Sequence, residues 1–176
     1  MASSITTLLQ RARRLFINRC VDARDIRAQL STEALDRLTA RVAASEQHHS
    51  GELRICIEAG LPWSYICRDA TPRDRALTLF GKLRVWDTEH NNGVLIYLLL
   101  AERAIELIAD RGINASVSAK QWSDLAITLG NTLTERPLED GLNEAVDALS
   151  DLLAAHFPAD GVRKINELPD QPVVLS

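Results

Sequence analysis

Residues 86–100 read WDTEHNNGVLIYLLL, and this stretch decides the fold. A polar loop turns on Asn91-Asn92-Gly93 and runs directly into a continuous apolar segment from Val94 to Leu100. A strand without a polar face is typical of one buried on both sides at the centre of a sheet. The stretch therefore predicts a central strand at 94–100, with a polar loop at its start.

Before this strand, the sequence predicts a first strand and a connecting helix. Apolar residues alternate over 53–57 after the break at Gly51, which indicates a strand with one polar face. Thr71-Pro72 is a good helix start, with the threonine as N-cap, and an apolar stripe follows through residue 83. Strand, helix and strand in this order form a βαβ unit, whose two strands are parallel.

After the central strand, the chain is predicted to turn back along it. Ala101-Glu102-Arg103 is long enough only for a tight reversal, so residues 105–109 should form an antiparallel strand. Two further helices follow, the first opened by a capping box at Ser118 and the second running over about 138–156. The order of elements predicts an α/β fold with α/β/α layers: a small mixed sheet, containing one βαβ unit and an antiparallel hairpin, between helices.

The two ends of the chain are predicted to extend this domain. Residues 5–18 have apolar side chains at helical spacing and arginines at the flanks, which indicates an N-terminal amphipathic helix. Residues 20–30 look like a connection, and Ser31 caps a helix over 31–46. We therefore divide the chain into an N-terminal helix and connection (1–30), an α/β domain (31–158) and an extended tail (159–176).

Composition excludes several classes of function. A net charge of −4 and a pI near 5.6 give no basic footprint for nucleic acid, which is therefore not an expected partner. No apolar run approaches the roughly 20 residues that span a bilayer, and the start of the chain lacks a secretory signal, so a cytoplasmic protein is expected. The three cysteines lack metal-site spacing, and no motif for an organic cofactor is present.

Polar residues from three distant segments should meet at one edge of the sheet. Parallel strands start at the same edge, and the antiparallel third strand ends there. We call the resulting set the acidic rim, and it comprises Glu52, Asp87, Thr88, Asn91, Asn92, Asp110 and Arg111. Its three carboxylates would repel one another unless a positive group joins them.

Three interpretations of this rim stay open. Ca²⁺ or Mg²⁺ would suit oxygen ligands such as Glu52, Asp87 and Asp110. Thr88, Asn91, Asn92 and Arg111 are candidate binding residues of the same rim. Arg111 could instead neutralise the carboxylates by ion pairing. Ordinary turn chemistry is the third interpretation, because Asp, Asn and Gly are the usual turn residues.

The chain also resembles the TPM domain family, a family labelled as phosphatase-type, over residues 31–158. The matching positions occur in the family's order and comprise Glu46, Ser50-Gly51-Glu52, Asp87-Thr88, residues 92–97, residues 110–113, Trp122, residues 140–142 and residues 156–158. The tail is similar to that of small stand-alone bacterial members, which suggests a cytoplasmic bacterial protein. Plant lumenal members are associated with photosystem repair and acid phosphatase activity, and some members bind calcium. The resemblance thus implies the fold and suggests two chemistries for the rim.

Two functions follow as hypotheses. The first is a non-catalytic binding or adaptor module for a protein partner, linked to assembly or quality control of a membrane complex. The second is a metal-dependent phosphatase that uses the rim to hold a cation, with Arg111 placed to contact phosphate. Residues 5–18 suit contact with an anionic membrane surface, although packing on the domain or on a second copy is the alternative. Trp63 and Tyr65, after Pro62, are candidates for an exposed aromatic pair at the opposite edge that contacts a partner, and packing in the core is the alternative. The oligomeric state is not indicated.

Overall fold

The sheet of this chain is mixed and has four strands. The computed structural model describes residues 2–159 and 166–176, which form a sheet of strand order β3-β2-β1-β4. β1 (Glu52–Glu58) pairs in parallel with both β2 (Gly93–Leu99) and β4 (Val173–Leu175), and β3 (Ala104–Ala109) is antiparallel to β2. The predicted βαβ unit and hairpin are confirmed.

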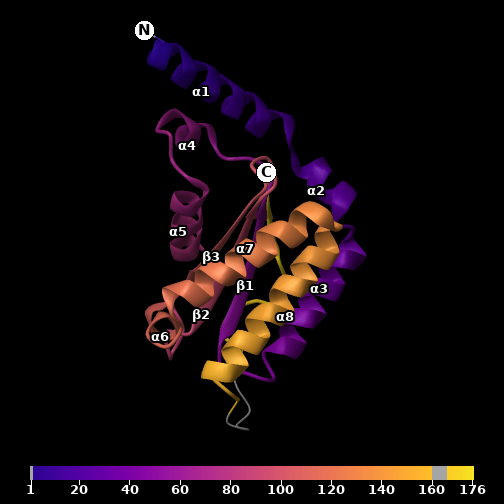
Figure 1. Cartoon of the computed structure of the whole chain (residues 1–176). Helices are drawn as coiled ribbons and strands as arrows, with labels where there is room; N and C mark the ends of the chain where they lie inside the picture. Colours follow the sequence, from indigo (N-terminus) through magenta and orange to yellow (C-terminus); the bar gives the residue numbers. More distant parts are fainter. Residues whose placement is uncertain (1, 160–165) are drawn as a thin grey trace.

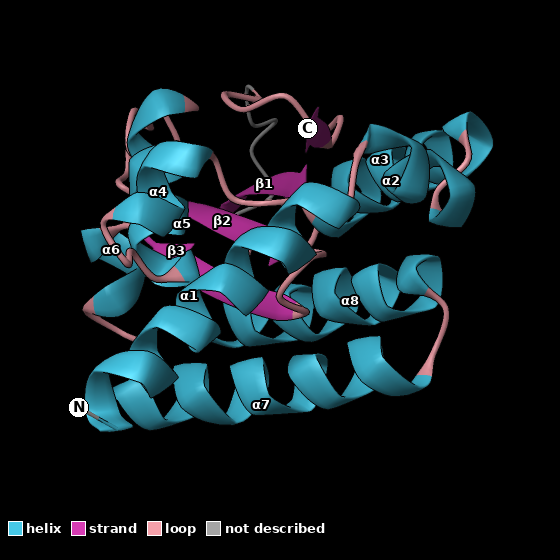
Figure 2. Cartoon of the chain, turned by 90° about the horizontal axis from the view of Figure 1, so that it is seen from above, coloured by secondary structure: helices cyan, strands magenta, loops and turns pink. Residues whose placement is uncertain are grey.

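Helices cover both faces of the sheet (Figure 1). α5 (Pro72–Lys82) and the short α4 (Trp63–Cys67) lie on one face. α3 (Thr32–Ser45), α7 (Ala119–Glu135) and α8 (Leu138–His156) lie on the other. Seen from above in Figure 2, the strands run between α5 and α8. The predicted α/β/α layering is confirmed.

Each face of the sheet has its own hydrophobic core. Ile55 and Ile96 belong to the core shared with α3 and α8, whereas Leu95 and Leu99 belong to the core shared with α4 and α5. Every residue of β2 is buried, which explains why that segment is apolar without alternation. Burying one such aliphatic side chain contributes about 1.5–3 kcal/mol, so both cores stabilise the central strands.

β1 does not have the polar face that its alternation predicts. Cys56 is 0% exposed and Glu58 is 2% exposed, because α4 and α5 cover this side of the strand. A buried carboxylate needs a partner. Arg75 of α5 supplies it, with Nε donating to Oε2 of Glu58 at 2.9 Å.

The segment predicted as a connection over 20–30 contains a helix, α2 (Ala23–Gln29). Asp22 and Asp25 form a capping box at its start, since each carboxylate accepts a backbone N–H bond. Ile26 and Leu30 are buried in the α3–α8 core. Burial of these two side chains stabilises the short helix. The spacing of apolar residues in the sequence does not by itself predict this burial.

Three more short elements were not expected. α4 lies in the predicted loop after β1, and α6 (Arg111–Asn114) begins where only a turn was predicted, with Asp110 as its N-cap. β4 forms in the predicted extended tail by pairing with Cys56–Glu58. Residues 160–165 of that tail lie outside the described residues.

The predicted N-terminal helix is present as α1 (Ala2–Cys20), which passes over α4 (Figure 1). The side chains of residues 2–9, where the predicted apolar stripe begins, lie outside the described part. Within the described residues, no helix combines the length and apolar character needed to cross a bilayer.

Candidate functional site

The starts of β1 and β2 and the end of β3 meet at one edge of the sheet. Glu52 lies opposite Gly93 in the parallel register, and its amide donates to the carbonyl of Asn92 at 3.0 Å. The amide of Asp110 donates to the carbonyl of Gly93 at 2.9 Å. The backbones of the three rim segments are therefore adjacent, as strand polarity predicts.

The side chain of Glu52 binds the C-terminal segment rather than facing solvent. It is 0% exposed, and its Oε2 accepts backbone N–H bonds from Glu167 at 3.3 Å and from Leu168 at 3.2 Å. Leu168 is itself buried. Glu52 thus fixes the segment that leads into β4, a structural role that the sequence did not indicate.

The other two carboxylates have separate local roles. Asp87 is half-exposed and forms an ion pair with Arg84. Asp110 caps α6, with Oδ1 accepting from the amide of Arg111 at 2.7 Å. Its Oδ2 is buried and has no hydrogen-bond partner among the described residues.

A metal site built on Glu52, Asp87 and Asp110 has no support from these positions. Across residues 2–159 and 166–176, no group of three or more His, Cys, Asp and Glu side chains is arranged to hold a metal ion. Cation binding at the rim therefore stays a prediction from the sequence.

The four remaining rim residues are joined in pairs. The hydroxyl of Thr88 accepts from the amide of Asn92 at 3.0 Å, and the side-chain amide of Asn92 donates to the Ser50 carbonyl. Nε of Arg111 donates to Oδ1 of Asn91 at 3.1 Å. Asn91 has a φ of 52°, in the left-handed region that asparagine tolerates well. Turn chemistry accounts for most of these contacts.

Trp86 is the feature of this edge that the sequence analysis overlooked. It is 51% exposed beside Asp87, and its indole N–H donates to the Gly81 carbonyl at 3.3 Å. His90 in the same loop and Arg111 at the start of α6 are also exposed. The rim thus presents a large aromatic side chain among polar groups that local hydrogen bonds hold in place.

A second polar cluster is buried at the opposite end of β1 and β2. The Glu58 carboxylate accepts from Arg75 and from the phenol of Tyr97, the latter at 2.7 Å. Burial and the charge of Glu58 raise the pKa of Tyr97. Burial alone would lower the pKa of Arg75, but its hydrogen bonds to the Glu58 carboxylate and the charge of that carboxylate outweigh this effect, so the pKa is raised. Arg75 lies four residues before Leu79 and shares the buried face of α5 with it. This helical spacing is the sequence signal from which the burial of Arg75 could have been predicted.

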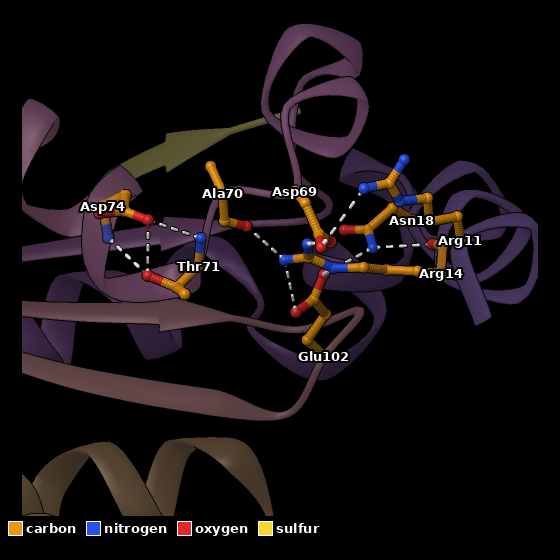
Figure 3. A network of polar contacts seen from close by, with 8 residues as sticks. All are labelled: Arg11, Arg14, Asn18, Asp69, Ala70, Thr71, Asp74 and Glu102. Carbon is orange, nitrogen blue, oxygen red and sulfur yellow. Dashed lines mark hydrogen bonds and ion pairs between the residues drawn. The ribbon is translucent and has the colours of Figure 1, made fainter. Parts of the chain in front are cut away.

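A third polar cluster attaches α1 to the domain (Figure 3). Arg14 donates from Nε to Glu102 at 2.7 Å and from Nη2 to the Ala70 carbonyl at 2.7 Å. The buried Asn18 accepts from the amide of Leu61 at 2.7 Å and donates to Glu102 at 2.9 Å. These contacts show that the C-terminal half of α1 packs on the domain.

The two candidate aromatic residues near α4 differ: one is exposed, and core packing holds for the other. Trp63 is 62% exposed, but Tyr65 is buried. The Tyr65 hydroxyl donates to Thr78 at 2.8 Å, and the guanidinium of Arg68 lies 4.0 Å from its ring centroid. Tyr65 therefore packs between α4 and α5 rather than forming a partner surface.

Comparison with known proteins agrees with this architecture. The profile of the TPM domain matches residues 24–152. The chain belongs to the TPM domain family. Among solved structures, the BA42 protein from the psychrophilic bacterium Bizionia argentinensis is similar to this TPM domain protein with a TM-score of 0.72 and 26% identity. The similarity covers 82% of this chain and 94% of that chain.

A second solved structure supports the fold alone. The N-terminal domain of a protein from P. gingivalis is similar to this TPM domain protein with a TM-score of 0.58 and 21% identity, over 73% of this chain and 78% of that chain. No curated protein matches the chain.

Proposed function

We propose that this TPM domain protein is a binding module whose acidic rim recognises a protein partner without transforming it. The observation that carries the proposal is the exposed indole of Trp86 beside the Arg84–Asp87 ion pair. Tryptophan and arginine are enriched among the residues that dominate binding energy at protein interfaces. A membrane-complex subunit met during assembly or quality control is the kind of partner we propose.

The hydrogen bonds of the rim also favour binding over chemistry. Thr88 fixes the loop before β2, Arg111 holds Asn91, and Asp110 caps α6. A rigid loop loses little conformational entropy when a partner docks, so preorganisation of this kind raises affinity.

Photo-crosslinking tests this proposal. A photoreactive phenylalanine at position 86 should give one discrete cross-linked partner in cells, whereas the same group at the exposed Ile127 of α7 should not. The purified partner should then bind the unmodified chain, and Trp86→Ala should weaken binding by 2 kcal/mol or more, roughly the threshold of an interface hot spot. Equal binding by Trp86→Ala and Ile127→Ala would reject the rim as the interface.

The alternative is a metal-dependent phosphatase. It is favoured by Oδ2 of Asp110, a buried carboxylate oxygen without a partner among the described residues, next to the exposed Arg111. Hydrolysis of p-nitrophenyl phosphate should then require added Mg²⁺ or Ca²⁺ and should be lost in Asp110→Ala and Asp87→Ala. Activity that survives both substitutions would remove the rim from any such reaction.

A further inference from the structure

A cavity of about 530 Å³ lies at the carboxyl end of β2, the end of the sheet opposite the acidic rim. Its wall comes from four segments: the end of α1, α2, the β2–β3 turn, and the junction of α7 with α8. This volume lies within the range of roughly 300–1,000 Å³ that is typical of small-molecule sites.

Most of the residues that line the cavity have apolar side chains, although polar groups also reach its surface. Ile17 at the end of α1 and Val21 just after it contribute to the wall, as do Leu98 at the end of β2 and Leu100 just after that strand. Leu133 closes the wall from α7. Binding of an aliphatic chain against these side chains is favourable, because apolar surface of both the protein and the ligand is removed from water.

Three polar residues of the wall already use their side chains locally. The carboxylate of Asp25 accepts from the amide of Asp22 at 2.7 Å, within the capping box of α2. Gln29 donates to the carbonyl of Asp25 at 3.4 Å, and the hydroxyl of Thr134 donates to a carbonyl one turn earlier in α7, at 2.7 Å.

Arg103 is the exception. Its guanidinium is exposed and makes no hydrogen bond or ion pair with any residue that the structure describes. Its backbone has a φ of 49°, a conformation that glycine or asparagine would adopt at lower cost. The adjacent Glu102 is held by Arg14 and Asn18, so the turn that presents Arg103 is fixed. The chain thus holds an exposed guanidinium at a defined position beside a cavity that is lined in part by aliphatic side chains.

We propose that this cavity binds a small anionic amphiphile, an aliphatic chain with one terminal carboxylate. The carboxylate pairs with the two-pronged guanidinium of Arg103, and the chain packs on the leucines of β2 and α7. The site is independent of the rim, so either proposal can fail without the other.

Titration of the full chain with decanoate, followed by ¹⁵N amide chemical shifts and calorimetry, tests the proposal. Decanoate should shift the amides of Leu98, Leu100 and Thr134 at saturation. Decanol should bind more weakly, because it lacks the charge that pairs with Arg103. Arg103→Asn, which suits the left-handed backbone, should weaken decanoate binding roughly tenfold, the loss expected for a bond to a charged group.

Two further variants make the result specific. Arg84→Asn replaces another exposed arginine with a left-handed backbone, φ 57°, outside the cavity, and should bind decanoate as the unmodified chain does. Val21→Phe should reduce binding by filling the cavity. Absence of decanoate binding, equal affinity in Arg103→Asn, or binding of decanol as tight as that of decanoate would each overturn the proposal.

Discussion

The phenol of Tyr97 and the carboxylate of Glu58 share a hydrogen bond of 2.7 Å inside the protein, on the side of the sheet that α5 covers. Arg75 reaches the same carboxylate from α5. One buried carboxylate therefore links β1, β2 and the crossover helix, the three elements of the βαβ unit. Because all three side chains are buried, the loss of any partner leaves a polar group without compensation.

We predict that Arg75→Met destabilises the protein by about 3–5 kcal/mol, the usual loss when one partner of a buried ion pair is removed. Arg41→Met provides the control, because Arg41 pairs with Asp147 at the exposed surface and should lose at most about 1 kcal/mol. Urea denaturation of the three chains measures both values. Equal losses of unfolding free energy in the two variants would show that the buried ion pair contributes no more to stability than the exposed one.

A second prediction concerns alkaline pH. Burial and the charge of Glu58 raise the pKa of Cys56 from 9.0 to about 12. Above pH 9 the unfolded chain releases this proton and the folded chain keeps it, so stability should fall as pH rises. The slope approaches about 1.4 kcal/mol per pH unit for one proton.

Cys56→Ala should remove most of this slope between about pH 9 and 10, because the unfolded thiol ionises near pH 9.0 whereas the unfolded Tyr97, whose pKa is also raised on folding, ionises nearer pH 10.0. The free energy of unfolding, measured by urea at several pH values, gives both slopes. Parallel slopes in the two chains would contradict the prediction. Thiol labelling gives a second check, since Cys20 and Cys67 are exposed and should react in the folded protein while Cys56 does not.

The elements that the sequence predicts well are those whose signal is local. The apolar run of β2 needs no partner to be recognised, and Ser118 with Gln121 forms the expected capping box. β4 could not be predicted in the same way, because its three residues form a strand only after the tail returns to β1. α2 depends similarly on the burial of Ile26 in a core formed by distant segments.

The same distinction between local and long-range determinants applies to the candidate site. Strand polarity correctly brings the backbones of Glu52, Asn92 and Asp110 to one edge. It does not determine where side chains point, and Glu52 binds amides of residues 167 and 168, more than a hundred positions away in the chain. The exposure of Trp86 likewise depends on packing that no local pattern records.

Two glycines offer a matched test of packing near the rim. A Cβ on Gly93 would lie 2.0 Å from the Val85 carbonyl oxygen, whereas a Cβ on Gly81 would meet nothing within 4 Å. Gly93→Ala should therefore cost about 1–3 kcal/mol through overpacking. Gly81→Ala, inside α5, should stabilise the protein by up to about 1 kcal/mol, because alanine favours helix. Thermal unfolding compares the two, and a stable Gly93→Ala chain would show that this edge can relax.

The last prediction concerns α1, whose two sides differ. Arg14 and Asn18 attach one side to the domain, and Phe16, between them in sequence, points to the other side and is 69% exposed. Arg13 and Arg19 are also exposed. Residues 1–20 contain no acidic residue in a chain whose net charge is −4, so this helix is a local basic surface. We predict that it binds an anionic membrane surface while its other side stays on the domain.

Co-sedimentation with vesicles rich in phosphatidylglycerol measures this binding. Arg13→Gln with Arg19→Gln should lower the partition coefficient roughly tenfold or more, since each basic residue near an anionic surface contributes about 1 kcal/mol. Phe16→Ser should also weaken binding, whereas Ile127→Ser, at an equally exposed apolar residue of α7, should not. Because the contact is electrostatic in part, neutral phosphatidylcholine vesicles and high salt should both reduce it. Equal sedimentation of the full chain and of one that begins at Asp25 would show that α1 serves only to pack on the domain.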